Sequence, residues 1–175
     1  LFLQTIALLA RQTPKKSSLP KTITRARYKS HADDAVEILD DAGKFLSQEF
    51  GMGLEGSRKL IPYDSMFAPL GISLSRIGHL YPIPSPAKAQ AIKKIEKWFV
   101  GSVLAQRYSE GQPTTQQHDT RELERWIEDD EASMQPWLGH FRVPSLTNVR
   151  PNSAIGRLLR CLISQNGPRD PLNNE

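Results

Sequence analysis

Apolar residues recur every three or four positions along most of this chain, and alternation of apolar with polar residues is nearly absent. This spacing is the period of an α-helix that buries one face, whereas a half-buried strand has a period of two. In the segment 31–50 the apolar stripe consists of Ala35, Ile38, Leu39, Ala42, Phe45, Leu46 and Phe50. The sequence therefore predicts an all-α fold, a single irregular bundle of about six helices.

Capping residues mark the ends of the two longest helical patterns. The pattern over 31–50 stops at Gly51, and glycine readily adopts the left-handed conformation that closes a helix. Ser85 followed by Pro86 has the N-cap and first-position chemistry of a helix that begins there. We therefore expect one helix to end at Gly51 and a longer one to cover 86–108.

The remaining helices are predicted from shorter patterns. Asp119 followed three residues later by Glu122 has the pattern of a capping box, so a helix is expected to begin near Asp119. The other three expected helices cover 1–11, 64–77 and 151–166. The side chains expected to fill the core between the helices are Trp98, Phe99, Leu123, Trp126, Leu158, Leu159 and Leu162.

The length of 175 residues suits one domain with a core of its own, and no point along the chain suggests a boundary. We therefore expect one helical domain over 1–175. Residues 12–30 are rich in Pro, Ser, Thr and basic side chains, and are expected to form a basic loop that is functional or partly flexible. The apolar start without a methionine predicts a fragment of a larger multidomain protein.

Cysteine use and hydropathy exclude several classes. The longest apolar run, 6–10, is far shorter than the roughly 18–20 residues of a membrane span, so we expect no membrane partner. Cys161 is the single cysteine, which excludes an internal disulfide framework and a cysteine zinc ribbon. The sequence therefore predicts a cytoplasmic protein.

Motifs for catalysis or cofactors are not apparent. The acidic run 128–131 has the carboxylates that Mg²⁺ prefers, but a solvated helix end explains it more simply. Cys161 lies beside an apolar stripe, where a thiol packs as a small hydrophobe, and no phosphate-binding glycine loop occurs. The histidines lack metal-ligand spacing; they are His31, His79, His118 and His140. We therefore predict no catalytic, cofactor-binding or metal-binding residue in this chain.

Charge is distributed unevenly, although the formal net charge is only +4. The segment from Arg11 to Lys29 holds seven basic and no acidic residues, whereas 119–131 holds seven acids and two arginines. A basic loop contacts phosphates without regard to sequence, and an ordinary solvated loop is the alternative. The residues expected to contact a DNA backbone are Lys15, Lys16, Lys21, Arg25, Arg27, Lys29, Arg150, Arg157 and Arg160.

A set of helical motifs covers most of the chain. They are KIEKWF at 94–99, RYS at 107–109, DTREL at 119–123, NSAIGRLLRCL at 152–162 and GPRD at 167–170, preceded by AGKFL at 42–46, Gly51 and LIPY at 60–63. Together they resemble the helical middle region of the GmrSD-type restriction nucleases. Those proteins join an N-terminal ParB-like nucleoside-triphosphatase domain to a C-terminal HNH-like nuclease domain and attack modified phage DNA.

The resemblance implies a function without catalysis in this chain. The Asp-Gly-Gln-Gln-Arg motif of the ParB-like domain and the His-His pair of the HNH domain do not occur here. The expected role is therefore a module that links the two domains of a phage-defence endonuclease, with those domains and DNA as partners. The alternatives are a helical protein–protein interaction domain, which a large exposed apolar patch would favour, and an independent enzyme with an unrecognised site.

Overall fold

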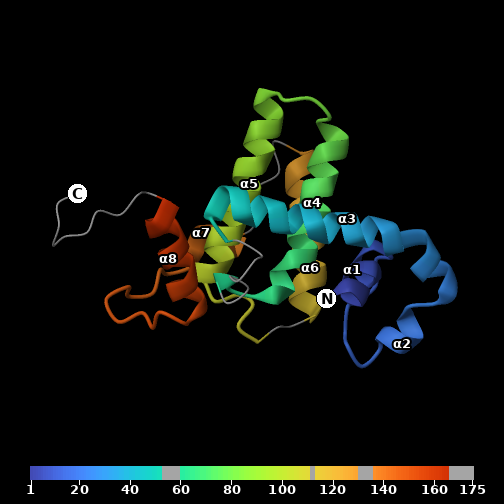
Figure 1. Ribbon diagram of the computed structural model, residues 1–175, viewed down its shortest axis with the longest axis horizontal. Coiled ribbons are helices and arrows are strands. Elements are labelled where there is room, and N and C mark those ends of the chain that lie inside the picture. Colours follow the sequence, from blue (N-terminus) through green and yellow to red (C-terminus); the bar gives the residue numbers. More distant parts are fainter. Residues whose placement is uncertain (53–59, 111–112, 130–135, 166–175) are drawn as a thin grey trace.

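The computed structural model describes residues 1–52, 60–110, 113–129 and 136–165, and every regular element within them is a helix (Figure 1). The elements are α1 (Phe2–Leu9), α2 (Leu19–Thr22), α3 (Arg25–Phe50), the 3₁₀ helix η2 (Asp64–Met66), α4 (Phe67–Leu80), α5 (Pro86–Leu104), α6 (Pro113–Glu128), α7 (Pro136–His140) and α8 (Ala154–Gln165). Six of these helices are eight residues long or longer, so the predicted all-α bundle of about six helices is confirmed.

The two predicted caps are present. Gly51 closes α3 with a φ of 62°, the left-handed conformation that favours glycine. The Ser85 hydroxyl accepts a hydrogen bond from the backbone N–H of Lys88 at 3.1 Å, and Pro86 opens α5. Both ends were predictable because a cap depends on the residues next to it.

The segment expected to be a basic loop is partly helical. Thr24 caps α3 by accepting a hydrogen bond from the Arg27 N–H at 3.3 Å, so the helix begins at Arg25 and not at His31. Residues 19–22 form α2. Arg25, Arg27 and Lys29 are therefore helical, and the non-helical part of 12–30 is confined to short stretches around α2.

The predicted beginning of a helix at Asp119 is wrong. Helix α6 begins at Pro113, a residue that the first turn of a helix accepts well, and Asp119 lies inside it with no exposed surface. The short helix α7 lies outside every range for which a helix is expected. Helix α8 begins at Ala154, and the hydroxyl of Ser153 before it accepts a hydrogen bond from the Gly156 N–H at 3.1 Å.

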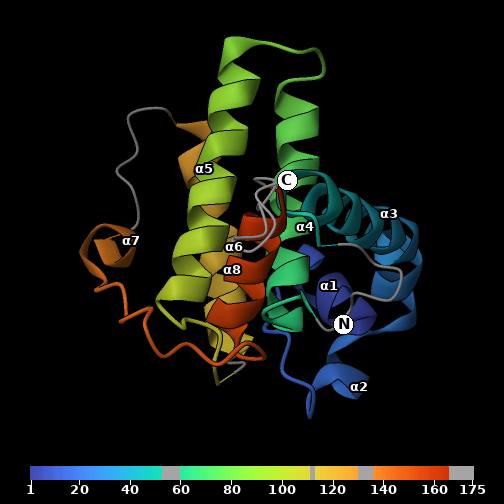
Figure 2. The ribbon, with the colours of Figure 1, turned by 60° about the vertical axis from the view of Figure 1, so that its left-hand side comes forward.

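Helix α4 lies at the centre of the bundle and packs against α1, α3, α5 and α6 (Figures 1 and 2). Helices α4 and α5 lie side by side, and the loop between them is at one extremity of the molecule. Helix α8 packs against α5 and α3. None of the helices in the described part of the chain has the length and apolar character of a membrane span.

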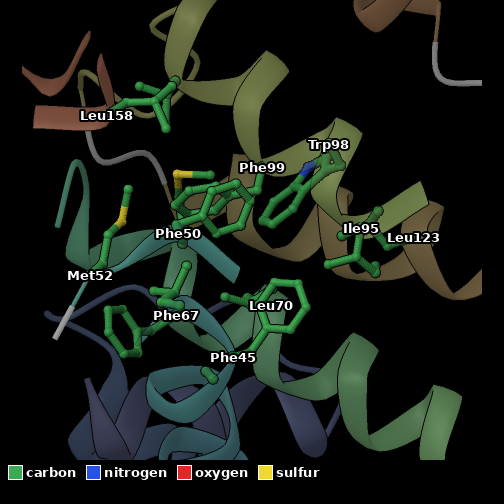
Figure 3. Packing of buried hydrophobic residues seen from close by; sticks show 14 of the residues in the cluster. Phe45, Phe50, Met52, Phe67, Leu70, Ile95, Trp98, Phe99, Leu123 and Leu158 are labelled. Carbon is green, nitrogen blue, oxygen red and sulfur yellow. The ribbon is translucent and has the colours of Figure 1, made fainter. Parts of the chain in front are cut away.

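The core lies between these helices, where aromatic rings from different elements meet (Figure 3). Phe50 of α3 lies against Phe99 of α5, with ring centroids 4.8 Å apart. Trp98 and Phe99 are at most 1% exposed. Of the predicted core residues, Leu123, Trp126 and Leu158 are also buried, whereas the remaining two, Leu159 and Leu162, are half-buried. The predicted core is thus largely confirmed.

Candidate nucleic-acid interface

A buried carboxylate organises the contact between α5 and α6. Asp119 accepts hydrogen bonds from Trp98 Nε1 at 3.2 Å and from the Tyr108 hydroxyl at 2.8 Å. Arg107 approaches the same carboxylate with Nε at 2.9 Å and Nη2 at 2.6 Å. Its guanidinium also stacks over the ring of Trp137, 4.5 Å from the centroid. Donors from α5 and from the turn after it therefore satisfy one buried charge.

This cluster is structural. Burial raises the pKa of Tyr108 well above its usual value, and the adjacent Asp119 charge raises that pKa further, so the tyrosine stays a hydrogen-bond donor. Asp119 lines none of the three pockets described below. A sequence signal was available, because Asp119 shares a helical stripe with Leu123, Trp126 and Ile127, all of them buried.

Two of the nine predicted DNA-contact residues meet at one pocket, which we call the cationic pocket. It has a volume of about 450 Å³, and both Lys16 and Arg157 line it. Arg157 is half-buried and donates from Nη1 to the Ile61 carbonyl at 3.0 Å, which fixes its guanidinium. Lys16 is exposed, so its ammonium can meet a ligand from the solvent side.

The position of Lys16 depends on the segment before it. Arg11 forms an ion pair with Glu124 of α6, and Thr13 Oγ1 donates to Gln117 Oε1 at 2.7 Å. Gln4 Nε2 donates to the carbonyl of Pro14 at 3.1 Å. These contacts attach residues 11–14 to α1 and α6 and so bring the following lysines to the pocket. Arg11 itself is already paired with a carboxylate.

A second pocket, which we call the amide pocket, adjoins the cationic pocket at Arg157. It has a volume of about 410 Å³ and shares Pro62, Tyr63 and Arg157 with the cationic pocket. Among the described residues, no carboxylate lines it. The polar residues that line it are Tyr63, Gln106, Ser109, Ser145, Asn148, Asn152, Ser153 and Arg157. The amide pocket thus adds neutral hydrogen-bonding groups next to Arg157, on the surface that the cationic pocket begins.

The other seven predicted residues do not form one continuous basic stripe with the cationic pocket. Lys15, Lys21, Arg25, Lys29, Arg150 and Arg160 are exposed. Arg27 Nη1 donates to the Thr22 carbonyl at 2.6 Å. Helix α2 and the beginning of α3 lie towards one end of the molecule's long axis, and α8 lies towards the other (Figure 1). The expected DNA-contact set is therefore divided between two regions.

An acidic pocket of about 570 Å³ lies between α3 and α4, and no sequence pattern indicated it. Its acidic and basic lining residues are Asp34, Glu37, Asp41, Glu124, Arg76 and His79. Arg76 is already engaged, because its Nε and Nη2 each lie 2.7 Å from Glu128 Oε1. Carboxylates therefore dominate this pocket.

Metal ligands do not converge in the part of the chain that the structure describes, where no group of three His, Cys, Asp or Glu residues could hold an ion. The four histidines belong to four different helices. In the acidic run 128–131, Glu128 pairs with Arg76, and positions 130 and 131 lie outside the described residues. Cys161 is buried, and burial raises the pKa of its thiol.

Comparison of the chain with models of known protein families, with curated proteins and with solved structures gives no match.

Proposed function

We propose that this chain is a non-catalytic helical module of a GmrSD-like restriction nuclease that contacts the DNA backbone at the cationic pocket. The observation that carries the proposal is the meeting of Lys16 and Arg157, which come from opposite ends of the chain, at one pocket. The motifs given above supply the connection to the nuclease family. In that setting the module links the nucleotide-dependent domain to the HNH domain.

Phosphate binding is the chemistry that these groups perform best. An arginine with a fixed guanidinium and a nearby lysine neutralise phosphate oxygens, and neutral amides and hydroxyls position the adjoining backbone. The amide pocket supplies such neutral groups beside Arg157, and no carboxylate among its described lining residues would repel a phosphate. Affinity of this kind is insensitive to sequence and falls steeply with salt.

The test is fluorescence anisotropy of a labelled duplex DNA at three salt concentrations. Replacing Lys16 and Arg157 together with Gln should weaken binding and flatten the salt dependence, by about 0.9 in the log–log slope for each phosphate that the protein no longer neutralises. The matched control replaces the exposed Lys21 and Arg25 with Gln, which removes the same charge from residues that line none of the three pockets. Equal effects of the two double variants, or no effect of either, would contradict the proposal.

The acidic pocket favours a second candidate function, binding of a basic segment of a partner protein. Four carboxylates line it; Glu124 is paired with Arg11 and Asp41 lies 3.9 Å from Lys44, while the lining cation Arg76 is itself paired with Glu128. An arginine-rich labelled peptide should bind this pocket, and Glu37→Gln with Asp41→Asn should weaken that binding. If peptide binding depends on these two acids while DNA binding is undetectable, the interaction-domain alternative replaces the DNA proposal.

A further inference from the structure

A buried amide in the cationic pocket lacks the partner that a stable fold would normally give it. Three buried side-chain atoms among the described residues make no hydrogen bond: Ser73 Oγ, Ser102 Oγ and Gln116 Oε1. Gln116 is only 2% exposed, and of the three residues it alone lines one of the pockets described above. An unsatisfied buried polar group opposes folding, so its presence beside a pocket calls for a ligand to complete it.

An aromatic wall stands in the same pocket. Tyr63 is half-buried, and its ring lies 6.5 Å from the ring of Tyr108 at an interplanar angle of 36°. Tyr108 is in turn fixed by its hydrogen bond to Asp119. Contacts with the core therefore order the Tyr63 ring. A flat ring bound in the pocket would stack on a side chain that is already in place.

The charged residues that line the pocket indicate which group the other end of the ligand carries. Lys16 and Arg157 stand against one lining carboxylate, Asp64, so the described lining carries two positive charges and one negative charge. A ligand that suits these groups has an anionic end, a flat ring and an edge that hydrogen-bonds to an amide. The volume of about 450 Å³ falls within the range of roughly 300–1,000 Å³ usual for small-molecule pockets.

We propose that the cationic pocket binds one nucleoside phosphate, with the phosphate at Lys16 and Arg157, the base stacked on Tyr63, and the base edge hydrogen-bonded to Gln116. The inference rests on the proposed DNA contact, because it uses the same two cations. A carboxamide both donates and accepts, which matches the paired donor and acceptor on the edge of adenine. A base enters such a pocket only when it is outside the stacked duplex, as in a bulge or a free nucleotide.

The experiment compares three probes: a duplex DNA, the same duplex with one bulged adenosine, and free deoxyadenosine monophosphate. The bulged duplex should bind more tightly than the perfect one. Gln116→Leu should remove that preference by lowering the affinity for the bulged duplex about tenfold. If the free nucleotide binds and Gln116→Leu abolishes that binding, the ligand is a soluble nucleotide. If only the bulged duplex binds, the ligand is a nucleotide within a strand.

Stability separates a ligand-binding role from a structural one. Removing an unsatisfied buried oxygen should leave the melting temperature of Gln116→Leu equal to or above that of the wild type. Gln116→Met, which keeps the unbranched shape, is the second variant if Leu does not fold. Ser102→Ala is the matched control, because it removes another unpartnered oxygen that lines none of these pockets, and it should leave all DNA affinities unchanged.

The outcomes distinguish this inference from the proposed function. Equal affinity for bulged and perfect duplexes, with binding that still depends on Lys16 and Arg157, would overturn the nucleotide pocket and leave the backbone contact intact. A wild-type preference for the bulge that persists in Gln116→Leu would overturn the role of Gln116 and with it the inference. Absence of binding to all three probes would overturn both proposals, whereas Gln116-dependent binding of the free nucleotide alone would support the pocket without the DNA contact.

Discussion

The carboxylate of Asp119 offers the sharpest test of how this fold is held together. Replacing Asp119 with Ala leaves the Trp98 N–H, the Tyr108 hydroxyl and the Arg107 guanidinium, whose side chain is 21% exposed, without their acceptor. Removing one partner of a buried ion pair costs about 3–5 kcal/mol, mainly because the other charge stays desolvated and unpaired. We therefore expect Asp119→Ala to lower the free energy of unfolding by about that amount.

Urea unfolding followed by far-ultraviolet circular dichroism measures this loss. Asp40→Ala is the matched control, because Asp40 also pairs with a cation, Lys44 at 2.6 Å, but both side chains are more than half exposed. An exposed pair of this kind contributes at most about 1 kcal/mol. A loss below about 1 kcal/mol for Asp119→Ala would refute the burial and pairing described here.

A double-mutant cycle identifies the mechanism. Arg107→Met alone leaves the Asp119 charge buried without its cation and should also be strongly destabilising. Asp119→Leu combined with Arg107→Met removes both charges, and its loss should be much smaller than the sum of the losses of Asp119→Leu alone and Arg107→Met alone. Additive losses would show that the two side chains act independently.

Three further outcomes follow from burial. Gly71→Ala should destabilise by about 1–3 kcal/mol in urea unfolding, because an added Cβ would lie 2.2 Å from the Ile38 carbonyl oxygen, and α3 and α4 would have to separate. Cys161 should react with a thiol reagent far more slowly in the folded protein than in urea, since its side chain is buried and its thiol has a raised pKa; equal rates would contradict this. The Tyr108 pKa is raised on folding, so the unfolded chain loses this proton first, and stability should fall above about pH 10 by about 1.4 kcal/mol per pH unit for this group. Tyr108→Phe should reduce that slope in unfolding measured at several alkaline pH values.

Local patterns predicted the features that local physics determines. The apolar period indicated the helices, and Gly51 and Ser85 indicated two of their ends, because each signal involves neighbours within one or two turns. The beginning of α3 was within reach by the same reasoning, since Thr24 is a good N-cap, but the basic residues after it carry no apolar period. Helix α7 is too short to produce a period.

Features that depend on distant residues were missed or only half found. The role of Asp119 requires Arg107 and Tyr108, and the turn that presents them contains Gln106 with a φ of 52°. Charge alone placed Lys16 and Arg157 among nine candidates. Their meeting depends on contacts that attach residues 11–14 to α6, which no pattern in the sequence reveals. The sequence therefore contains no signal that separates Lys16 and Arg157 from the other seven candidates.

Helix α6 contains one buried polar side chain with several hydrogen-bond partners and another with an unpartnered oxygen. This contrast supports the proposal of a ligand at the second. Asp119 accepts hydrogen bonds from Trp98, Arg107 and Tyr108. The fold can therefore supply partners to a polar side chain that is buried in this helix. Gln116, one helical turn earlier, keeps an unpartnered oxygen and lines the cationic pocket. Replacement by an apolar residue would remove the cost at no loss of packing, so stability alone does not explain an amide at this position. Tyr108 connects the two places, since it donates to Asp119 and lies beside the Tyr63 ring that forms the pocket wall. Asp119 thus orders Tyr108, and Tyr108 in turn packs against the Tyr63 ring that lines the same pocket as Gln116.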